Sequence, residues 1–226
     1  EAEAARKAAE LAKPKHILGA GLSGLSAATI LARAGCEVHV HEIREDSGAR
    51  FDGDFQGIEN WTSDADFFDE MRDWGLDPGE FKSDAFDVID LVHPDDVITR
   101  PNTDGVAFRI VQRGTEGHTI DQGLKRMAIE AGVEIHYGTR REPGDCHIVA
   151  AGPRESSAVA FGEIFHTDHP NHVTFQLNDK LAPGAYSYLI VIDGIGLICT
   201  CLWRQQRKST RYLNETIAWY EQHLSA

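Results

Sequence analysis

The chain has 226 residues, of which 22 are basic and 36 acidic, giving a formal net charge of −14 at pH 7. This length fits one globular domain, or one domain with a small lobe. Because phosphate backbones and anionic lipids repel so acidic a surface, we expect neither a nucleic-acid-binding nor a peripheral-membrane protein. The longest apolar stretches are strand-sized, well below the roughly 20 residues of a membrane helix, so we expect no membrane span.

The first residues predict an appended segment. Before Pro14 the chain consists of Ala, Glu, Lys and Arg with a single Leu, a composition that favours helix but offers no apolar stripe. It also lacks the apolar core and cleavage site of a secretion signal. We therefore expect residues 1–14 to be a helical extension, residues 15–226 to form the domain, and the protein to be cytoplasmic. Its four cysteines show no metal-binding spacing and are expected to be reduced.

The domain itself opens with a βαβ pattern. A short strand is predicted at 16–18, a helix at 22–34 and a second strand at 37–41. Lys15 and His16 stand where a buried parallel strand is usually apolar. The opening nevertheless indicates an α/β fold.

Helices and strands continue to alternate through the middle of the chain. Ser63 and Asp66 form a capping-box pattern ahead of a helix that Gly75 closes. Thr119 and Gln122 predict the cap of another helix. Strands are predicted at 86–92, 106–111, 133–137 and, as a buried type, 146–151.

The last third of the chain predicts an antiparallel sheet closed by a helix. Strand-like stretches lie near residues 158–165, 172–177, 185–192 and 195–203. Leu213, Ile217, Tyr220 and Leu224 share one helical face, so the final segment is expected to pack on the domain. Strands at about 84–112 and 156–204 are expected to form a smaller lobe inserted into the α/β domain.

A glycine-rich loop joins the first strand to the first helix: Gly19, Ala20, Gly21, Leu22, Ser23 and Gly24. This is the context that the dinucleotide fingerprint requires. Gly19 permits the tight turn, Gly21 lets the backbone approach a pyrophosphate, and Gly24 lets the helix lie close to the sheet. Glu42, at the end of the second strand, can accept hydrogen bonds from ribose hydroxyls and disfavours a 2′-phosphate. The sequence predicts a site for an adenine dinucleotide, either FAD or NAD.

These features resemble the FAD-dependent oxidoreductases of the glutathione reductase-like superfamily, and most nearly the geranylgeranyl reductase and lycopene cyclase-like flavoproteins. The resemblance rests on the glycine loop, on residues 42–50, on Arg113 and on the apolar stretch 147–152. Residues 183–188 are similar to a substrate-lobe motif, with Ala185 where a glycine is usual. The resemblance covers residues 15–203 and implies a Rossmann-like FAD/NAD(P)-binding domain with an inserted antiparallel substrate-lobe sheet.

The resemblance also places further residues beside the cofactor: Ile43, Arg44, Arg50, Arg113, Ala151 and Gly152. Arg44 would lie near the adenosine, Arg50 near the pyrophosphate, and Arg113 near the ribityl chain or the loop supporting it. A guanidinium suits these roles because it pairs with phosphate, although a solvated surface arginine is the alternative for each. The stretch 51–61 is either a loop approaching the flavin or a surface loop.

The function that the resemblance implies is flavin-mediated hydride transfer to an apolar substrate of isoprenoid type. No residue stands out as a catalytic acid or base. Nothing after Trp203 reproduces the Gly-Asp motif that family members carry there. A truncated or engineered dinucleotide-binding scaffold without turnover therefore stays open, as does an NAD-binding enzyme.

The histidines do not predict a metal site. His166, His169 and His172 recur every third residue, but Pro170 interrupts the run and a strand would alternate their faces. His39 and His41 share a face of the second strand, where packing or surface roles are expected. We expect no bound metal.

Overall fold

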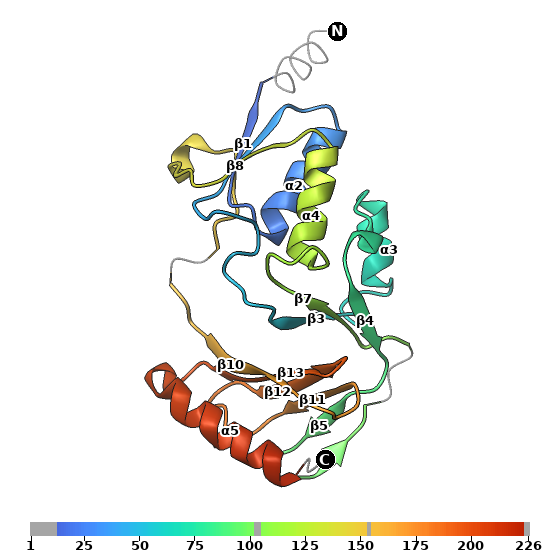
Figure 1. The fold of residues 1–226 in the computed structure, drawn as a ribbon, viewed down its shortest axis with the longest axis vertical. Coiled ribbons are helices and arrows are strands. Elements are labelled where there is room, and N and C mark those ends of the chain that lie inside the picture. Colours follow the sequence, from blue (N-terminus) through green and yellow to red (C-terminus); the bar gives the residue numbers. More distant parts are fainter. Residues whose placement is uncertain (1–12, 102–104, 153–154, 224–226) are drawn as a thin grey trace. The chain divides into compact units, whose positions relative to one another are not determined.

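The computed structural model describes residues 13–101, 105–152 and 155–223, so residues 1–12 of the expected N-terminal extension lie outside it (Figure 1). The chain forms two compact units. Residues 1–83 and 111–153 make the first, and residues 84–110 and 154–226 make the second. Within the described residues, no helix combines the length and apolar character needed to cross a lipid bilayer.

A parallel sheet forms the centre of the first unit. Its strand order is β8 (Glu134–His136), β2 (Val38–His41), β1 (Lys15–Leu18) and β9 (Ile148–Val149). The helices α2 (Leu22–Arg33) and α4 (Ile120–Glu130) lie side by side against this sheet (Figure 1). Ile17, Val38 and Val40 are fully buried in the core that the sheet shares with these helices. The expected Rossmann-like α/β architecture is confirmed.

Helix starts follow from local capping chemistry, with one correction. The hydroxyl of Thr119 accepts a hydrogen bond from the backbone N–H of Gln122 at 3.4 Å, so the predicted cap of α4 is confirmed. The predicted Ser63 cap of α3 (Phe67–Asp73) is wrong, because the Asp66 carboxylate accepts from Phe68 N at 2.8 Å. The Ser63 hydroxyl donates instead to Glu70 at 2.6 Å. The carboxylate directly before the helix therefore takes the capping position.

Three other predicted segments differ from the structure. The buried-type strand expected at 146–151 is reduced to the two residues of β9, and Val149 is 55% exposed because β9 forms the edge of its sheet. The strand expected at 86–92 is two strands in separate sheets, β4 (Ser83–Phe86) and β5 (Asp90–Val92). The stretch 51–61 is not all loop, since β3 (Phe55–Glu59) runs through it and joins β7 (Phe108–Gln112) and β4 in a three-stranded sheet.

The second unit contains a six-stranded sheet. Its order is β10 (Val159–His166), β13 (Ile195–Leu202), β12 (Ser187–Ile192), β11 (His172–Gln176), β5 and β6 (Ile98–Thr99). All neighbours pair antiparallel except β11 and β5, which run parallel. Short 3₁₀ turns complete the described elements: η1 (Pro78–Glu80), η2 (Pro143–Asp145) and η3 (Gln206–Lys208).

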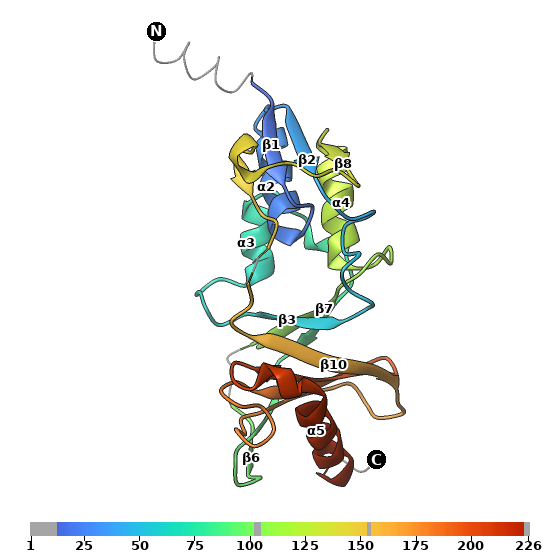
Figure 2. The ribbon, with the colours of Figure 1, turned by 90° about the vertical axis from the view of Figure 1, so that its left-hand side faces the viewer.

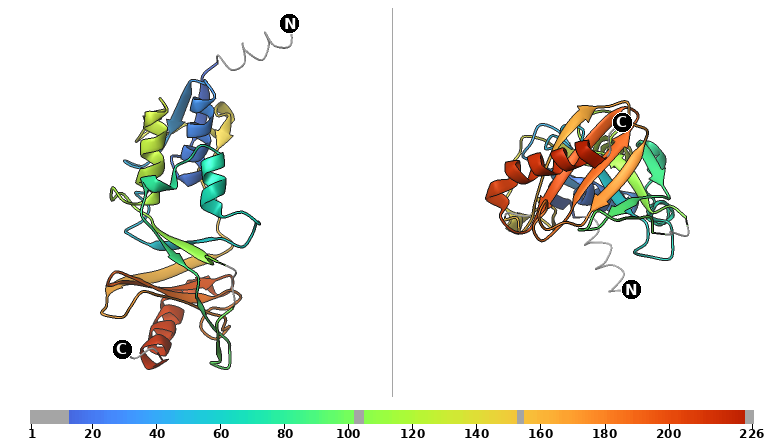
Figure 3. Two further views of the ribbon diagram at one scale, coloured as in Figure 1. Left: turned by 90° about the vertical axis from the view of Figure 1, so that its right-hand side faces the viewer. Right: turned by 90° about the horizontal axis from the view of Figure 1, so that it is seen from below.

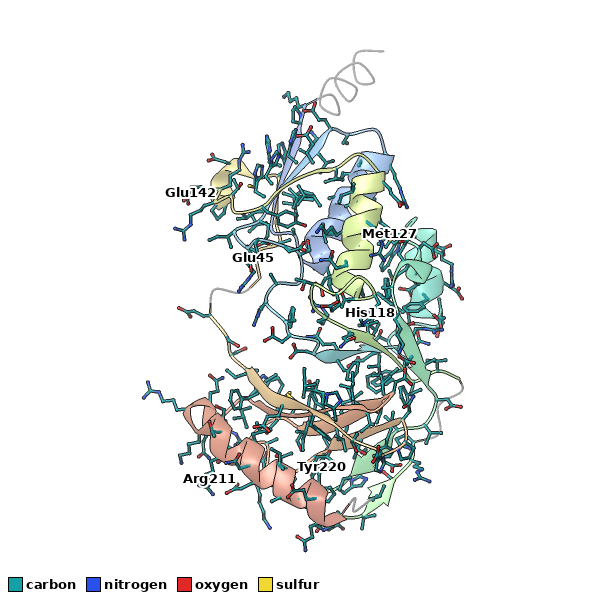
Figure 4. The ribbon with its side chains drawn as sticks, in the orientation of Figure 1. Glu45, His118, Met127, Glu142, Arg211 and Tyr220 are labelled. Atoms are coloured by element: carbon teal, nitrogen blue, oxygen red, sulfur yellow. The ribbon has the colours of Figure 1, made fainter. Side chains whose placement is uncertain are left out.

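Helix α5 (Ser209–His223) lies across one face of this six-stranded sheet (Figure 3). Leu213 and Tyr220 are buried against Leu189, Val191 and Ile198, as the helical spacing predicts. Figure 4 labels Tyr220 together with Arg211, which is exposed on the same helix. Leu224, the last member of the predicted apolar face, lies outside the described residues. All four cysteines are free thiols.

Candidate dinucleotide-binding site

The glycine loop between β1 and α2 needs its glycines for different reasons. Gly19 has a φ of 102°, and a Cβ atom there would lie 2.5 Å from the carbonyl oxygen of Ala150. A Cβ atom at Gly24 would lie 1.9 Å from the carbonyl oxygen of Gly19. At Gly21, by contrast, a Cβ atom would meet nothing within 4 Å. Gly19 and Gly24 therefore allow backbone segments to pack closely, whereas Gly21 leaves space for a ligand.

The first turn of α2 offers hydrogen-bond donors to that space. Gly21 occupies the N-cap position without a side-chain hydrogen bond, and the first turn contains no acidic residue. The first intrahelical bond runs from Leu25 N to Gly21 O at 2.9 Å, so the N–H groups before Leu25 have no partner within the helix. Free N–H groups and the positive end of the helix dipole together favour an anion such as a pyrophosphate.

The carboxylate of Glu42 lies directly beside this loop. Its Oε2 accepts a hydrogen bond from Ala20 N at 2.9 Å, and its Oε1 accepts one from Arg44 N at 2.9 Å. Each carboxylate oxygen retains a further lone pair for a hydroxyl donor. The side chain is thus held in place at the end of β2 while keeping the capacity to bind a ribose.

The segment that follows β9 borders the same loop. Ala150 N donates to Leu18 O at 2.7 Å, and a Cβ atom at Gly19 would approach Ala151 N to 3.0 Å. Gly152 follows with a φ of 76° and is exposed. The structure therefore brings Ala151 beside the glycine loop, from a strand more than a hundred residues later in the chain.

Arg113 is engaged inside the protein. Its Nε and Nη2 donate to the Asp121 carboxylate at 2.8 and 2.9 Å, and its Nη1 donates to Gln56 Oε1 at 2.7 Å. The centre of its guanidinium also lies 4.1 Å from the centroid of the Phe51 ring. Asp121 is fully buried and accepts a further bond from Gly114 N at 3.1 Å. This geometry fits the loop-supporting role among the two that the resemblance implies.

The loop at residues 46–50 packs on the segment that Arg113 supports. Gly48 has a φ of 82°, and a Cβ atom there would lie 2.3 Å from Gly114 O. Gln122 Nε2 donates to Ser47 O at 2.9 Å. The other arginines predicted for the site, Arg44 and Arg50, are exposed, and Ile43 is 61% exposed. Their side chains are accessible to a ligand, and the guanidinium of Arg50 lies 5.7 Å from the centroid of the Phe51 ring.

A charged pair also anchors this loop to α4. Lys125 Nζ lies 2.6 Å from Asp46 Oδ1, and Ser47 N donates to the same oxygen at 2.7 Å. Burial alone would raise the pKa of Asp46, but the hydrogen bonds from Lys125, Gln122 and Ser47 outweigh it and lower the pKa below its ordinary value. The ionised form of Asp46 is therefore favoured in the folded protein.

The free energy that Lys125 contributes is expected to depend on pH. Because folding lowers the pKa of Asp46, this contribution is present above the unfolded pKa of about 3.9 and lost as the pH falls through the folded value. Lys125→Met should lower the free energy of unfolding by up to about 1 kcal/mol at pH 7. Denaturant titrations at pH 7 and at pH 2.5 measure the difference, which should shrink in acid. A difference of equal size at both pH values, or an undiminished effect in an Asp46→Asn background, contradicts the prediction.

Several site residues carry no signal in the sequence. Asp121 reads as an ordinary residue in the first turn of a helix, and only the fold places it against Arg113. Gln122 is recognised as part of a cap, but its bond to Ser47 spans 75 positions of the chain. Outside this site, His136 lies beside the histidines of β2 only because β2 pairs with β8. Alternation along single strands does not reveal which strands become neighbours.

Comparison with known proteins identifies the first segment of the unit. Residues 17–56 match the family of NAD(P)-binding Rossmann-like domains. The chain is 55% identical over 40 residues to hydroxysqualene dehydroxylase of Rhodopseudomonas palustris, and 48% identical over 52 residues to that of Sinorhizobium fredii. These matches cover 18% and 23% of this chain but 10% and 12% of the two dehydroxylases.

Solved structures show a wider similarity. A geranylgeranyl bacteriochlorophyll reductase-like protein from Thermoplasma acidophilum is similar over 93% of this chain and 63% of its own, with a TM-score of 0.61 and 15% identity. The tetrameric form of 2-methyl-3-hydroxypyridine-5-carboxylic acid oxygenase is similar over 93% of this chain and 66% of its own, with a TM-score of 0.61 and 14% identity. The chain therefore has a Rossmann-like α/β fold with additional antiparallel sheets, and its residues 17–56 are similar to NAD(P)-binding Rossmann-like domains.

Proposed function

We propose that this protein binds FAD and acts as an FAD-dependent oxidoreductase of the geranylgeranyl reductase and lycopene cyclase-like kind. The observation that carries the proposal is the open space at Gly21 beside the fixed carboxylate of Glu42. The sequence matches to hydroxysqualene dehydroxylases and the fold shared with a reductase-like protein and an oxygenase support it. The match to NAD(P)-binding domains supports an adenine dinucleotide in general.

The glycine loop and Glu42 would bind different parts of the dinucleotide. The N–H groups at the start of α2 would hold the pyrophosphate, and Gly21 would let it approach the backbone. Glu42 would accept hydrogen bonds from the ribose hydroxyls, and its charge disfavours a 2′-phosphate, which favours FAD or NAD over NADP. The flavin supplies hydride transfer when bound, and the protein supplies positioning and charge compensation.

The proposed substrate is an apolar molecule of isoprenoid type. Two of the similar proteins have names that refer to hydroxysqualene and geranylgeranyl compounds. In the second unit, Phe108 stacks on Phe175 with ring centroids 5.0 Å apart, and Tyr186 and Tyr188 lie 5.8 and 6.1 Å from Phe175. Tyr188 alternates along β12 with Leu189 and Val191, which pack against α5. Aromatic side chains of this kind suit the binding of apolar chains.

The ligand content of the purified protein tests the proposal directly. We expect a flavin absorption spectrum as purified, or after incubation with FAD and removal of excess ligand. Reduced nicotinamide added without oxygen should then bleach the bound flavin. A colourless protein that FAD does not reconstitute contradicts the proposal, and binding of NADH by that protein would favour the NAD-binding alternative. Bound flavin that no donor reduces would favour a scaffold without turnover.

Gly21→Val is expected to weaken FAD binding by about 100-fold, equivalent to about 2.7 kcal/mol, without unfolding the protein. The valine side chain would occupy the space that the pyrophosphate needs, and no protein atom lies within 4 Å of its Cβ position. Fluorescence titration with FAD measures the affinity, and circular dichroism checks the fold. The matched control is Gly117→Val, because a Cβ atom there also enters open space, but in the exposed loop before α4 instead of at the start of α2. Unchanged affinity in Gly21→Val would contradict the assignment of the loop.

A further inference from the structure

Histidines line the face of the parallel sheet opposite its buried core. His16 in β1, His39 and His41 in β2, and His136 in β8 alternate with the buried residues Ile17, Val38 and Val40. The register places His16 beside His39 and His41 beside His136. In Figure 2 the chain that follows β8 passes over the side of this sheet that faces the viewer. Parallel sheets usually carry apolar residues on both faces, so this concentration of imidazoles requires its own explanation.

Three ligand atoms converge at the β2–β8 side of this face. His39 Nδ1 lies 3.1 Å from His136 Nε2 and 3.3 Å from Glu134 Oε2. His136 Nε2 lies 3.8 Å from Glu134 Oε2. Around a tetrahedral zinc ion with bonds of about 2.0–2.2 Å, neighbouring ligand atoms are about 3.3–3.6 Å apart. We propose that His39, His136 and Glu134 form a binding site for a divalent transition-metal ion of the zinc type.

A second carboxylate orients His39 toward the site. His39 Nε2 lies 2.9 Å from Glu37 Oε1. Because the Glu37 carboxylate only accepts, the tautomer with the proton on Nε2 satisfies this contact and leaves the Nδ1 lone pair for a metal ion. A metal-bound histidine almost always donates its other N–H to such a partner, which fixes the ring and raises its basicity. Glu37, Glu134 and the two imidazoles thus reproduce both the ligands and the orienting group of a metal site.

The donor set decides which metal the site takes. Two imidazole nitrogens and one carboxylate suit zinc and its neighbours, whereas magnesium and calcium prefer oxygen ligands alone. The side chain of His39 is 17% exposed, that of His136 39% and that of Glu134 66%. Solvent therefore has access to the fourth tetrahedral position. Three protein ligands with an open position also allow a small external ligand to bind the metal.

The two other histidines of this face, His16 and His41, contact the guanidinium of Arg141 instead. His16 Nδ1 and His41 Nε2 are 3.1 Å apart, and Arg141 Nη1 lies 3.1 Å and 2.9 Å from them. Both ring nitrogens therefore lie within hydrogen-bond distance of the Arg141 guanidinium, which can only donate. Arg141 takes the position between these two lone pairs. The metal site is therefore confined to His39, His136 and Glu134.

This proposal departs from the expectation of no bound metal. The β2 alternation shows that His39 and His41 share a face, but a site needs a third ligand from another strand. Among the residues that the structure describes, the group His39, Glu134 and His136 is the one that meets the requirement for three converging ligand atoms. Its recognition depends on the register between β2 and β8.

Titration of the flavin-free protein with zinc chloride tests the proposal without reference to the dinucleotide site. We expect one zinc ion per chain by calorimetry, and Co²⁺ as a second probe should give the visible bands of a tetrahedral ion. His136→Ala and Glu134→Gln each remove one ligand and should weaken zinc binding by about 100-fold or more. Glu37→Ala removes only the orienting group and should weaken zinc binding by about 10-fold. His118→Ala, a histidine of the same unit outside the site, should bind zinc like the unchanged protein.

The variants keep the proposal falsifiable. Glu134 is exposed, so Glu134→Gln is expected to fold even if His136→Ala does not. Wild-type protein that binds no zinc would overturn the proposal. Zinc binding of equal affinity in Glu134→Gln and His118→Ala would overturn it as well, because the ion would then be held by other surface groups. Either result leaves the FAD proposal unaffected, since no flavin is present in the experiment.

Discussion

Asp121→Asn is expected to lower the free energy of unfolding by about 3–5 kcal/mol, because it leaves the charge of Arg113 buried without its partner. The Asp121 carboxylate is fully buried and accepts both donors of a bidentate guanidinium pair, at 2.8 and 2.9 Å. Asparagine keeps the volume but turns one N–H group toward the guanidinium. Denaturant unfolding followed by circular dichroism measures the loss, which should accompany a lower melting temperature.

Two comparisons separate this effect from general sensitivity to charge changes. Glu215→Gln removes the partner of Arg211 in an exposed pair on α5, and it should leave the free energy of unfolding nearly unchanged. Replacing both buried partners, as Arg113→Met with Asp121→Leu, should recover much of the stability that Asp121→Asn loses. An Asp121→Asn variant as stable as the unchanged protein would show that the pair does not hold this segment in place.

Gly24→Ala is expected to destabilise the protein by about 1–3 kcal/mol, although alanine is the better helix former by about 0.8–1.0 kcal/mol. The reason is steric, because the added Cβ atom would lie 1.9 Å from Gly19 O and 3.4 Å from the Ala150 side chain. Both neighbours belong to the tight junction of β1, α2 and β9. The junction must therefore open, and FAD binding should weaken together with the melting temperature.

The matched variant is Gly21→Ala, three residues earlier in the same loop. Its Cβ atom enters open space, so the melting temperature should change little. Thermal unfolding of the two variants side by side makes the comparison. If Gly24→Ala were as stable as Gly21→Ala, or more stable through its helix propensity, the close approach of α2 to the glycine loop would not be a requirement of the fold.

The local parts of the fold follow from the sequence with few errors. The glycine loop, α2 and the Thr119 cap are each specified by neighbouring residues, and all appear in the structure. The errors occur where two residues can cap the same helix, or where the position of a strand within its sheet sets its length. Asp66 takes the capping position predicted for Ser63, and edge position limits β9 to two residues.

In the second unit, too, the sequence predicts single strands better than it predicts which strands pair. Apolar patterns predict the long strands β12 and β13 well, because Leu189 and Val191 of β12 and Ile198 of β13 are buried against α5. The pattern does not predict that residues 83–92 divide between two sheets, since short strands with polar residues pair according to their neighbours. The aromatic group around Phe175 likewise collects side chains from separate strands and loops.

By itself the sequence determined the α/β class and the glycine loop, since a positive φ, a helix start and a carboxylate after the second strand are requirements on residues close together in the chain. Only the tertiary structure decided that Arg113 donates its hydrogen bonds to Asp121, and that His39 lies beside His136, which is 97 positions later in the chain. Such contacts depend on which strands and loops become neighbours, and burial of the whole core, rather than any local pattern, selects that arrangement.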